Sequence, residues 1–136
     1  MGPPAAGATV APVPYYQFHI PAGSPSAGLK AEIAAAVTKV HTSVTGAPAR
    51  YVNVTFFELP PGNLFVADAP VGQGRMVGLI RSGRTAEVKR DLITGLADAW
   101  SAVTGEPRDG FALFFQEVPG AMVMEYGEIL PEAEFD

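Results

Sequence analysis

The stretch Pro14-Tyr15-Tyr16-Gln17-Phe18-His19-Ile20 decides the fold, because it is a short strand-like run with a proline at its front edge. If Pro14 is the first residue of the working protein, its nitrogen is a secondary amine whose lone pair can take or give a proton. Within a longer chain, the same nitrogen belongs to the Val13–Pro14 amide, which has no N–H and a delocalised lone pair. The acid–base chemistry open to the chain therefore depends on this peptide bond.

The composition predicts one globular domain with a single core, since the chain has 136 residues of which 48% are hydrophobic. The net charge is −5 and the basic residues are scattered, so we expect no nucleic-acid partner. The chain has no cysteine and only two histidines, so we expect no disulfide, metal site or cofactor. No apolar run has the ~18 residues of a membrane span and no secretory signal is readable, so we expect no membrane contact and a cytoplasmic location.

Residues 1–13 differ from the rest of the chain, since they are mostly Pro, Ala and Gly and have the period of neither helix nor strand. Such a segment does not offset its ordering entropy, so we predict a disordered extension before one domain over residues 14–136. A GTG codon is read as valine within a message but can initiate translation as methionine. We therefore hypothesise that translation starts at position 13 and that loss of this methionine exposes Pro14. Native peptides from residues 2–12 would contradict the hypothesis.

A β-α-β pattern follows twice, with Ser24 and Thr85 as candidate helix caps. The predicted elements are a strand over 14–20, a helix over about 29–44, a strand over 51–57, a strand over 76–80, a helix over about 86–103 and a strand over 111–115. The Gly/Pro-punctuated connection between the halves leaves room for a short strand or hairpin near residues 64–67. Its Gly72-Gln73-Gly74 is too short for a phosphate loop and lacks the lysine of one.

The two halves are an internal repeat, because a shift of 59 residues places Lys30 on Lys89 and Pro48 on Pro107. The repeats cover about 14–61 and 75–119, before a tail over 120–136. They predict an α+β fold in which a four-stranded sheet carries two helices on one face, with parallel strands inside each repeat. We expect the other face to be uncovered in a monomer and to drive oligomerisation. The residues expected on that face are Tyr16, Phe18, Val54 and Phe56.

This duplication resembles the tautomerase superfamily, specifically its cis-3-chloroacrylic acid dehalogenase-like branch, whose subunits are two fused β-α-β units. The resemblance runs from Pro14 to about Pro131. The residues that carry it are Pro14, His41 in Thr38-Lys39-Val40-His41, the run Pro61-Gly62-Asn63-Leu64-Phe65, Arg81-Ser82-Gly83-Arg84 and Glu125-Tyr126-Gly127. It implies a tautomerase/MIF-like fold and a homotrimer that covers the open sheet face.

The resemblance also implies roles for single residues. Pro14 matches the catalytic N-terminal proline, and Glu125 matches the acid that handles water. His41, Arg81 and Arg84 match residues that bind a substrate carboxylate. Phe114 is also expected to bind substrate, at the position where the family's dehalogenases have a tyrosine, but its ring neither donates nor accepts a hydrogen bond.

These roles predict an isomerase that interconverts keto and enol forms of small 2-oxo and 2-hydroxy-enoic carboxylic acids, with Pro14 as acid and base. Nearby arginines would lower the pKa of a free Pro14 amine and leave part of it neutral at pH 7. The alternative activity is hydration or dehalogenation of a cis-3-haloacrylate, which ranks second because Phe114 replaces the tyrosine. If the extension is retained, the alternative is a homologue that only binds a small carboxylic acid.

Each candidate side chain also has a structural interpretation. Arg81 and Arg84 lie at a strand end and a helix start, where the helix dipole favours an anion, but they are alternatively solvated or paired with acids of a neighbouring subunit. His41 is either a carboxylate ligand or a packed core histidine. Glu125 is either a buried proton carrier with a raised pKa or a carboxylate that points to solvent or pairs with an arginine. His19 is taken as structural.

Overall fold

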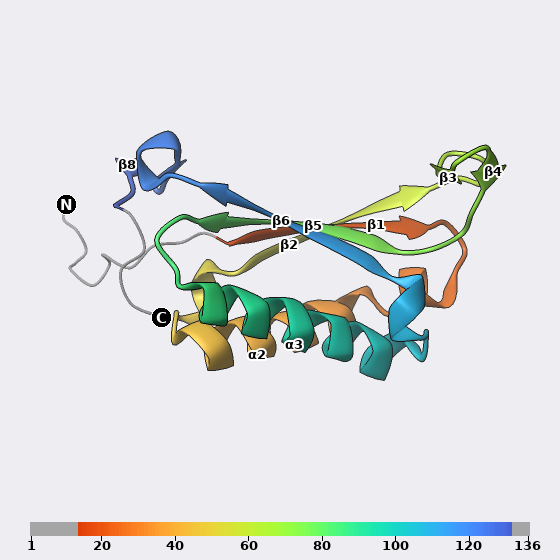
Figure 1. Cartoon of the computed structure of the whole chain (residues 1–136), viewed down its shortest axis with the longest axis horizontal. Helices are drawn as coiled ribbons and strands as arrows, with labels where there is room; N and C mark the ends of the chain where they lie inside the picture. Colours follow the sequence, from red (N-terminus) through yellow and green to blue (C-terminus); the bar gives the residue numbers. More distant parts are fainter. Residues whose placement is uncertain (1–13, 132–136) are drawn as a thin grey trace.

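The computed structural model describes residues 14–131 (Figure 1). The predicted disordered extension over residues 1–13 lies outside the described residues, as do the last five residues of the predicted tail. The strands are β1 (Tyr15–Pro21), β2 (Asn53–Leu59), β3 (Phe65–Val66), β4 (Ala69–Pro70), β5 (Arg75–Arg81), β6 (Ala112–Val118), β7 (Met124–Glu125) and β8 (Glu128–Ile129). The helices are α2 (Lys30–Thr45) and α3 (Ala86–Thr104), and the 3-10 turns are η1 (Pro25–Gly28), η2 (Ala49–Tyr51), η3 (Arg108–Gly110) and η4 (Gly120–Met122).

The four long strands form one mixed sheet in the order β2-β1-β5-β6. Within each repeat the strands are parallel, β1 with β2 and β5 with β6, because a helix carries the chain back between them. The two repeats meet through the antiparallel pair β1 and β5. This arrangement confirms the predicted fold, including the parallel pairs and the two helices on one face (Figure 1).

The duplication extends to individual contacts. Lys30 at the start of α2 forms an ion pair with Glu58 of β2, and Lys89 in α3 forms one with Glu117 of β6 at 2.6 Å. Both pairs join a helix to the last strand of its own repeat. The alignment of Lys30 with Lys89 in the sequence therefore reflects equivalent positions in space.

The core lies between the sheet and the two helices. Phe18 of β1 stacks on Trp100 of α3 with ring centroids 5.6 Å apart, and Ile33 and Val37 of α2 are buried in the same cluster. Burial of such side chains is worth about 1.5–3 kcal/mol each. The helical spacing of these apolar residues in the sequence follows from this packing.

The prediction of which side chains lie on the open sheet face is wrong. Tyr16 and Phe18 are 0% and 2% exposed and belong to the core, and Val54 and Phe56 pack against that core. Alternation along a strand defines two sets of side chains but not which set meets the helices. The more apolar set of β1 faces the helices here, because its burial gains more free energy.

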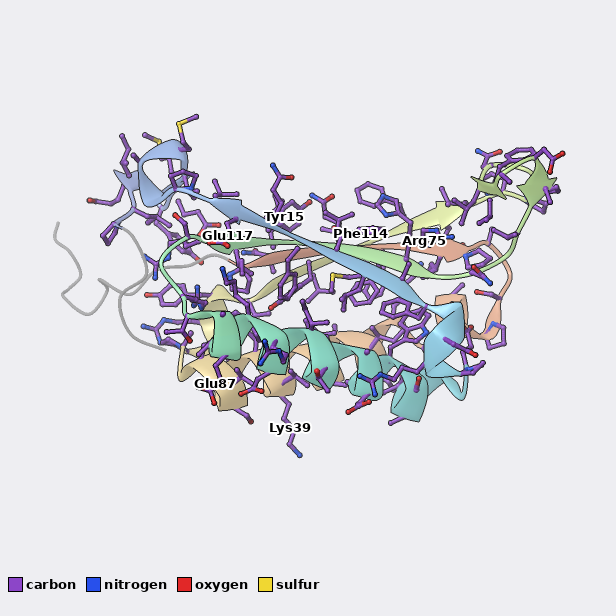
Figure 2. The ribbon with its side chains drawn as sticks, viewed as in Figure 1. Tyr15, Lys39, Arg75, Glu87, Phe114 and Glu117 are labelled. Carbon is purple, nitrogen blue, oxygen red and sulfur yellow. The ribbon has the colours of Figure 1, made fainter. Side chains whose placement is uncertain are left out.

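The open face carries the alternate residues instead, and Figure 2 shows Tyr15, Arg75 and Phe114 pointing away from the helices. Phe57 of β2 and Phe114 of β6 are 45% and 57% exposed on this face. Lys39 and Glu87 project from the helices on the opposite side of the molecule (Figure 2).

The caps explain where the helices begin. The Thr85 hydroxyl accepts a hydrogen bond from the Val88 N–H at 3.1 Å, so the predicted cap of α3 is confirmed. Ser24 also caps, but it caps the 3-10 turn η1 that precedes α2. Pro25 is the first residue of that turn, as expected from its fixed φ.

A hairpin at the end of the described chain was not predicted. The strands β7 and β8 pair antiparallel across a two-residue turn, Tyr126-Gly127, in which both residues have positive φ. The following backbone returns over Gly120, where an added Cβ would lie only 2.2 Å from the Pro131 carbonyl oxygen. Within residues 14–131, neither helix has the length and apolarity needed to cross a membrane.

Candidate active site

The candidate residues gather mainly at one end of the sheet, where β1 begins and β5 ends. In the antiparallel register Tyr15 of β1 lies opposite Leu79 of β5. Continued by one residue, this register places Pro14 opposite Ile80, next to Arg81. The turn into α3 and the β7–β8 hairpin lie at the same end of the molecule (Figure 1).

Pro14 is buried at the start of β1 and is tied to the neighbouring strand. Its carbonyl oxygen accepts hydrogen bonds from the backbone N–H of Asn53 at 3.1 Å and from the Asn53 side-chain amide at 3.3 Å. Two bonds to one carbonyl fix the peptide plane that follows the proline. The Pro14 ring is therefore held in place on its C-terminal side.

Arg81 and Arg84 are each only 7% exposed, so the interpretation as solvated turn residues is wrong. Arg81 is the last residue of β5, and its Nη1 donates to the Pro131 carbonyl at 2.6 Å. Arg84 lies in the turn just before the first residue of α3, a helix of 19 residues whose N-terminus adds positive potential. Two guanidiniums and a helix N-terminus at one place favour binding of a carboxylate.

His41 lies on the sheet-facing side of α2 and is fully buried. Its Nδ1 is 2.7 Å from the hydroxyl of Tyr16, which is also buried. Burial first and the charge of Arg84 second lower the pKa of His41 to about 3, so the imidazole is neutral at pH 7. The structure thus makes His41 a hydrogen-bonded core residue that also lies near Arg84.

Glu125 reaches this end of the sheet on β7. The hairpin is held there by an edge-on contact between Tyr126 and Tyr51, whose ring centroids are 6.1 Å apart. Tyr51 lies two residues before Asn53, the partner of Pro14. Burial raises the pKa of Glu125, which favours the buried interpretation over the solvent-exposed one, and its Oε1 is buried without a hydrogen-bond partner among residues 14–131.

Phe114 is not brought to the other candidates within one chain. It lies on the open sheet face opposite Val77, four residues before the level of Arg81 along β5. Four residues of strand span about 13 Å. A role for Phe114 at the site therefore requires a second copy of the chain on this face.

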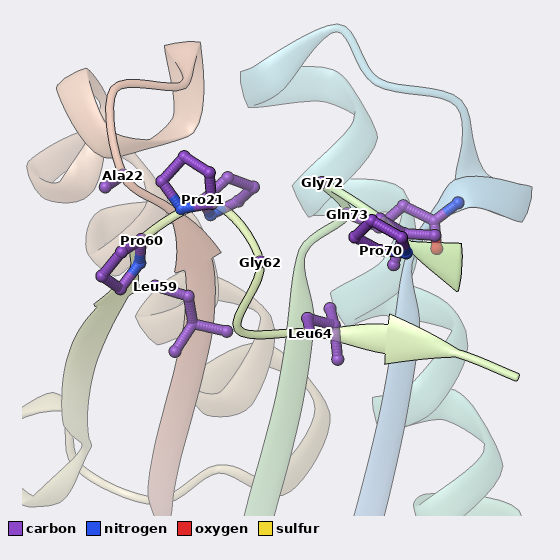
Figure 3. Close-up of a pocket in the computed structure, with 11 residues that line it drawn as sticks. Pro21, Ala22, Leu59, Pro60, Gly62, Leu64, Pro70, Gly72 and Gln73 are labelled. Carbon is purple, nitrogen blue, oxygen red and sulfur yellow. The ribbon is translucent and has the colours of Figure 1, made fainter. Parts of the chain in front are cut away.

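A hollow of about 220 Å³ lies at the opposite end of the sheet, where β1 and β2 terminate (Figure 3). Its lining is mostly proline and leucine and includes no titratable side chain. It therefore offers no acid or base. In the part of the chain that the structure describes, no group of three or more His, Cys, Asp or Glu is placed to hold a metal ion.

The sequence analysis did not predict that Tyr16 and Asn53 belong to this end of the sheet. Tyr16 could have been identified, since a tyrosine among the apolar residues of a strand needs a partner for its hydroxyl. Its partner could not have been predicted, because His41 is 25 residues away in the sequence. Asn53 had no signal, because its role depends on the register of β1 and β2.

Comparison with known proteins identifies the family. A family model described as "Putative oxalocrotonate tautomerase enzyme" matches residues 13–135. The chain belongs to the tautomerase superfamily, in its cis-3-chloroacrylic acid dehalogenase-like branch. The match covers the site residues of both repeats and the tail that carries Glu125. No curated protein was found to match.

Several solved structures are similar to this chain. The protein N1, a member of the cis-3-chloroacrylic acid dehalogenase family, is 32% identical with a TM-score of 0.82, and the match covers 87% of this chain and 84% of that one. The protein Pt0534, solved after inactivation by 2-oxo-3-pentynoate, is 26% identical with a TM-score of 0.77 over 85% of this chain and 94% of its own. A fused 4-OT solved as an asymmetric trimer is 22% identical with a TM-score of 0.79 over 85% and 94%, and shows the shared fold.

Proposed function

We propose that this tautomerase-superfamily chain interconverts the keto and enol forms of small 2-oxo and 2-hydroxy-enoic carboxylic acids. The observation that carries the proposal is the placement of the nearly buried Arg81 and Arg84 beside the start of β1, where Pro14 lies. The inactivation of the related Pt0534 by a 2-oxo acid is consistent with a substrate of this class.

The proposed reaction needs Pro14 as the N-terminal residue. A free proline amine has a reference pKa of about 7.7–8.0, and neighbouring guanidiniums favour its neutral form. The neutral amine takes the proton of the 2-hydroxyl group, and the resulting ammonium delivers a proton to carbon 3, which gives the 2-oxo acid. The reverse path starts with removal of the carbon-3 proton.

Arg81 and Arg84 hold the substrate carboxylate in this scheme, and His41 donates to it or to the developing enolate oxygen. A guanidinium binds a carboxylate with two parallel hydrogen bonds, which fixes the plane of the substrate. Fixed positive charge beside an enolate lowers the barrier because the negative charge grows in the transition state.

Glu125 supports a second activity, which is addition of water to an unsaturated acid with loss of halide from a 3-haloacrylate. Its half-buried carboxyl has a raised pKa and an oxygen without a partner among the described residues, as a water-activating base requires. The replacement of the family's tyrosine by Phe114 places this activity second. Release of chloride from cis-3-chloroacrylate measures it directly.

The proposed active unit is a homotrimer. Phe57 and Phe114 leave an apolar surface on the open sheet face, which is costly in water unless a second subunit covers it. The related fused 4-OT was solved as a trimer. Assembly through this face would also bring Phe114 to a site on a neighbouring subunit.

The test is ketonisation of phenylenolpyruvate by the full chain and by a protein that starts at Pro14. We expect the protein that starts at Pro14 to turn over and the full chain to be at least ~100-fold slower, because general acid–base catalysis supplies that much. R84Q in the Pro14-start protein should raise KM. Equal rates for both proteins would refute the role of the amine. Binding of malonate without turnover by either protein would identify a carboxylate-binding homologue instead.

A further inference from the structure

Tyr16 and His41 form a side-chain hydrogen bond between the sheet and the buried face of α2. Among the bonds described within residues 14–131, no other side-chain hydrogen bond joins a strand of the sheet to the buried face of α2 or α3. Both side chains are 0% exposed, and the hydroxyl is 2.7 Å from Nδ1. The two rings meet edge to face with centroids 5.7 Å apart and an interplanar angle of 70°. Polar groups are costly to bury, so the pair calls for a reason beyond packing.

The second repeat shows that packing alone does not require this pair. β1 and β5 begin with Tyr15 and Arg75, so Tyr16 is equivalent to Met76, and the shift of 59 residues makes His41 equivalent to Trp100. Met76 and Trp100 occupy the same core cluster without forming a side-chain hydrogen bond to each other. The fold therefore accepts a methionine and a tryptophan, which form no such bond, where the first repeat has a hydroxyl and an imidazole.

Two neighbouring residues restrict the position of the Tyr16 ring. Gly78 lies opposite Tyr16 in the β1–β5 register, and a Cβ there would lie 3.0 Å from the Tyr16 ring and 2.8 Å from the Phe115 ring. The Phe115 and Tyr16 rings are 6.3 Å apart. Gly78 thus supplies the space for the Tyr16 ring, and Phe115 restricts its movement.

Either group can donate in this bond, because both are neutral at pH 7. Burial raises the pKa of Tyr16 far above neutrality, so its hydroxyl keeps its proton at pH 7. The pKa of His41 is lowered, so its ring is neutral and has one N–H donor and one acceptor. When Tyr16 donates to Nδ1, the proton of His41 is on Nε2, which is buried and has no hydrogen-bond partner in the described chain.

We infer that Tyr16 is a positioning residue whose hydroxyl holds His41 as the Nε2–H tautomer, so that His41 donates a hydrogen bond to a substrate oxygen beside Arg84. A carboxylate only accepts hydrogen bonds, so the opposite tautomer would present a repelling lone pair to it. The proximity of Arg84, whose charge acts on both Tyr16 and His41, places the pair next to the carboxylate-binding residues. The role of the substrate in this inference rests on the proposed function.

The first test reads the tautomer without any substrate. The full chain is labelled with ¹⁵N, and long-range ¹H–¹⁵N correlations identify the protonated ring nitrogen of His41 at pH 7. The chain has two histidines, so H19Q assigns the signals. We expect one protonated nitrogen, Nε2, and an unprotonated Nδ1. A ring protonated at Nδ1, or at both nitrogens, overturns the inference, and this result requires no change at Tyr16.

The second test removes the hydroxyl. Y16F should yield a mixture of His41 tautomers. It should raise KM by the inverse of the fraction that remains protonated at Nε2, about two- to tenfold for a fraction between about one half and one tenth, while kcat changes less than about threefold. Y15F is the matched control, since it removes the neighbouring hydroxyl on the opposite face of β1, and it should leave the His41 spectrum unchanged. A Y16F protein with the wild-type tautomer, or with a KM equal to that of Y15F, would refute the positioning role.

The two tests separate this inference from the proposed function. If the protein that starts at Pro14 shows no turnover, the proposed function fails, but the spectra still decide whether Tyr16 sets the tautomer. If turnover is present and His41 is protonated at Nδ1, the proposed function stands and the role of Tyr16 is refuted.

Discussion

Replacing Gly120 by alanine should destabilise the end of the sheet that carries the candidate site. The new Cβ would lie 2.2 Å from the Pro131 carbonyl oxygen and 2.5 Å from that of Leu130, whereas ordinary contact begins at 3.4 Å. These are backbone atoms, which do not rotate away, so the returning segment must move by about 1.2 Å, the difference between 3.4 and 2.2 Å.

The size of the effect follows from the contacts that this movement breaks. The hydrogen bonds from Leu130 N to Val123 O and from Arg81 Nη1 to Pro131 O contribute about 1 kcal/mol each. Burial of the Leu130 side chain contributes about 2 kcal/mol more. We therefore expect G120A to lose about 2–4 kcal/mol, which lowers Tm by roughly 10 °C for a chain of this size.

The assay is thermal unfolding by circular dichroism at one fixed protein concentration, combined with hydrogen exchange of the Leu130 amide. G72A is the matched control, because a Cβ at Gly72 meets nothing within 4 Å and the glycine does not have positive φ. G72A should melt like the wild type. A G120A protein that melts within about 2 °C of G72A and keeps the Leu130 amide protected would refute the reasoning.

Three further predictions concern charge and assembly. R84Q should raise the pKa of His41 above about 3, because the charge of Arg84 is one of the two causes that lower it, but burial should keep this pKa below 6.5. The same substitution should weaken malonate binding about 10- to 100-fold. NMR titration measures both the pKa and the binding. Glu125 has a raised pKa in the folded chain, so its contribution to stability is present below the unfolded pKa and is lost as pH rises through the folded pKa. E125Q should therefore be more stable than the wild type at pH 7 but not below about pH 4, as measured by urea unfolding at both pH values. An E125Q protein that is less stable than the wild type at pH 7 would show that the carboxylate is paired. If the proposed trimer forms through the open sheet face, F57D should yield a monomer in sedimentation analysis, whereas I93D, at an exposed position of α3, should not. A trimeric F57D protein would place the interface elsewhere.

Much of the fold could be predicted from the sequence because the long helices and strands are specified by local patterns. The apolar spacing around Ile33 and Leu92 predicted two helices, and β-branched and aromatic runs predicted the long strands. The 59-residue shift predicted the duplication, which the equivalent ion pairs of Lys30 and Lys89 reproduce. The β7–β8 hairpin was not readable, because its strands have two residues each and its turn uses Tyr126 at positive φ.

The candidate site was readable only in part. Pro14, His41 and the two arginines were predicted from a resemblance in spacing, and they lie at one end of the sheet, while their roles stay predictions. The burial of Arg81 and Arg84 was not readable, since arginine in a turn is usually solvated. The sheet face to which Tyr16 points was predicted wrongly. Alternation along a strand separates its side chains into two sets, but it does not say which set faces the helices.

By itself, the sequence determined the repeat, the order of strands and helices, and the chemical groups available, because these depend on residue type and spacing along the chain. Only the tertiary structure decided which groups meet. The antiparallel β1–β5 register brings Arg81 beside Pro14, and the packing of α2 on the sheet brings His41 to Tyr16. Such contacts join residues 25 or more positions apart, and their free energy arises only when the core has formed around them.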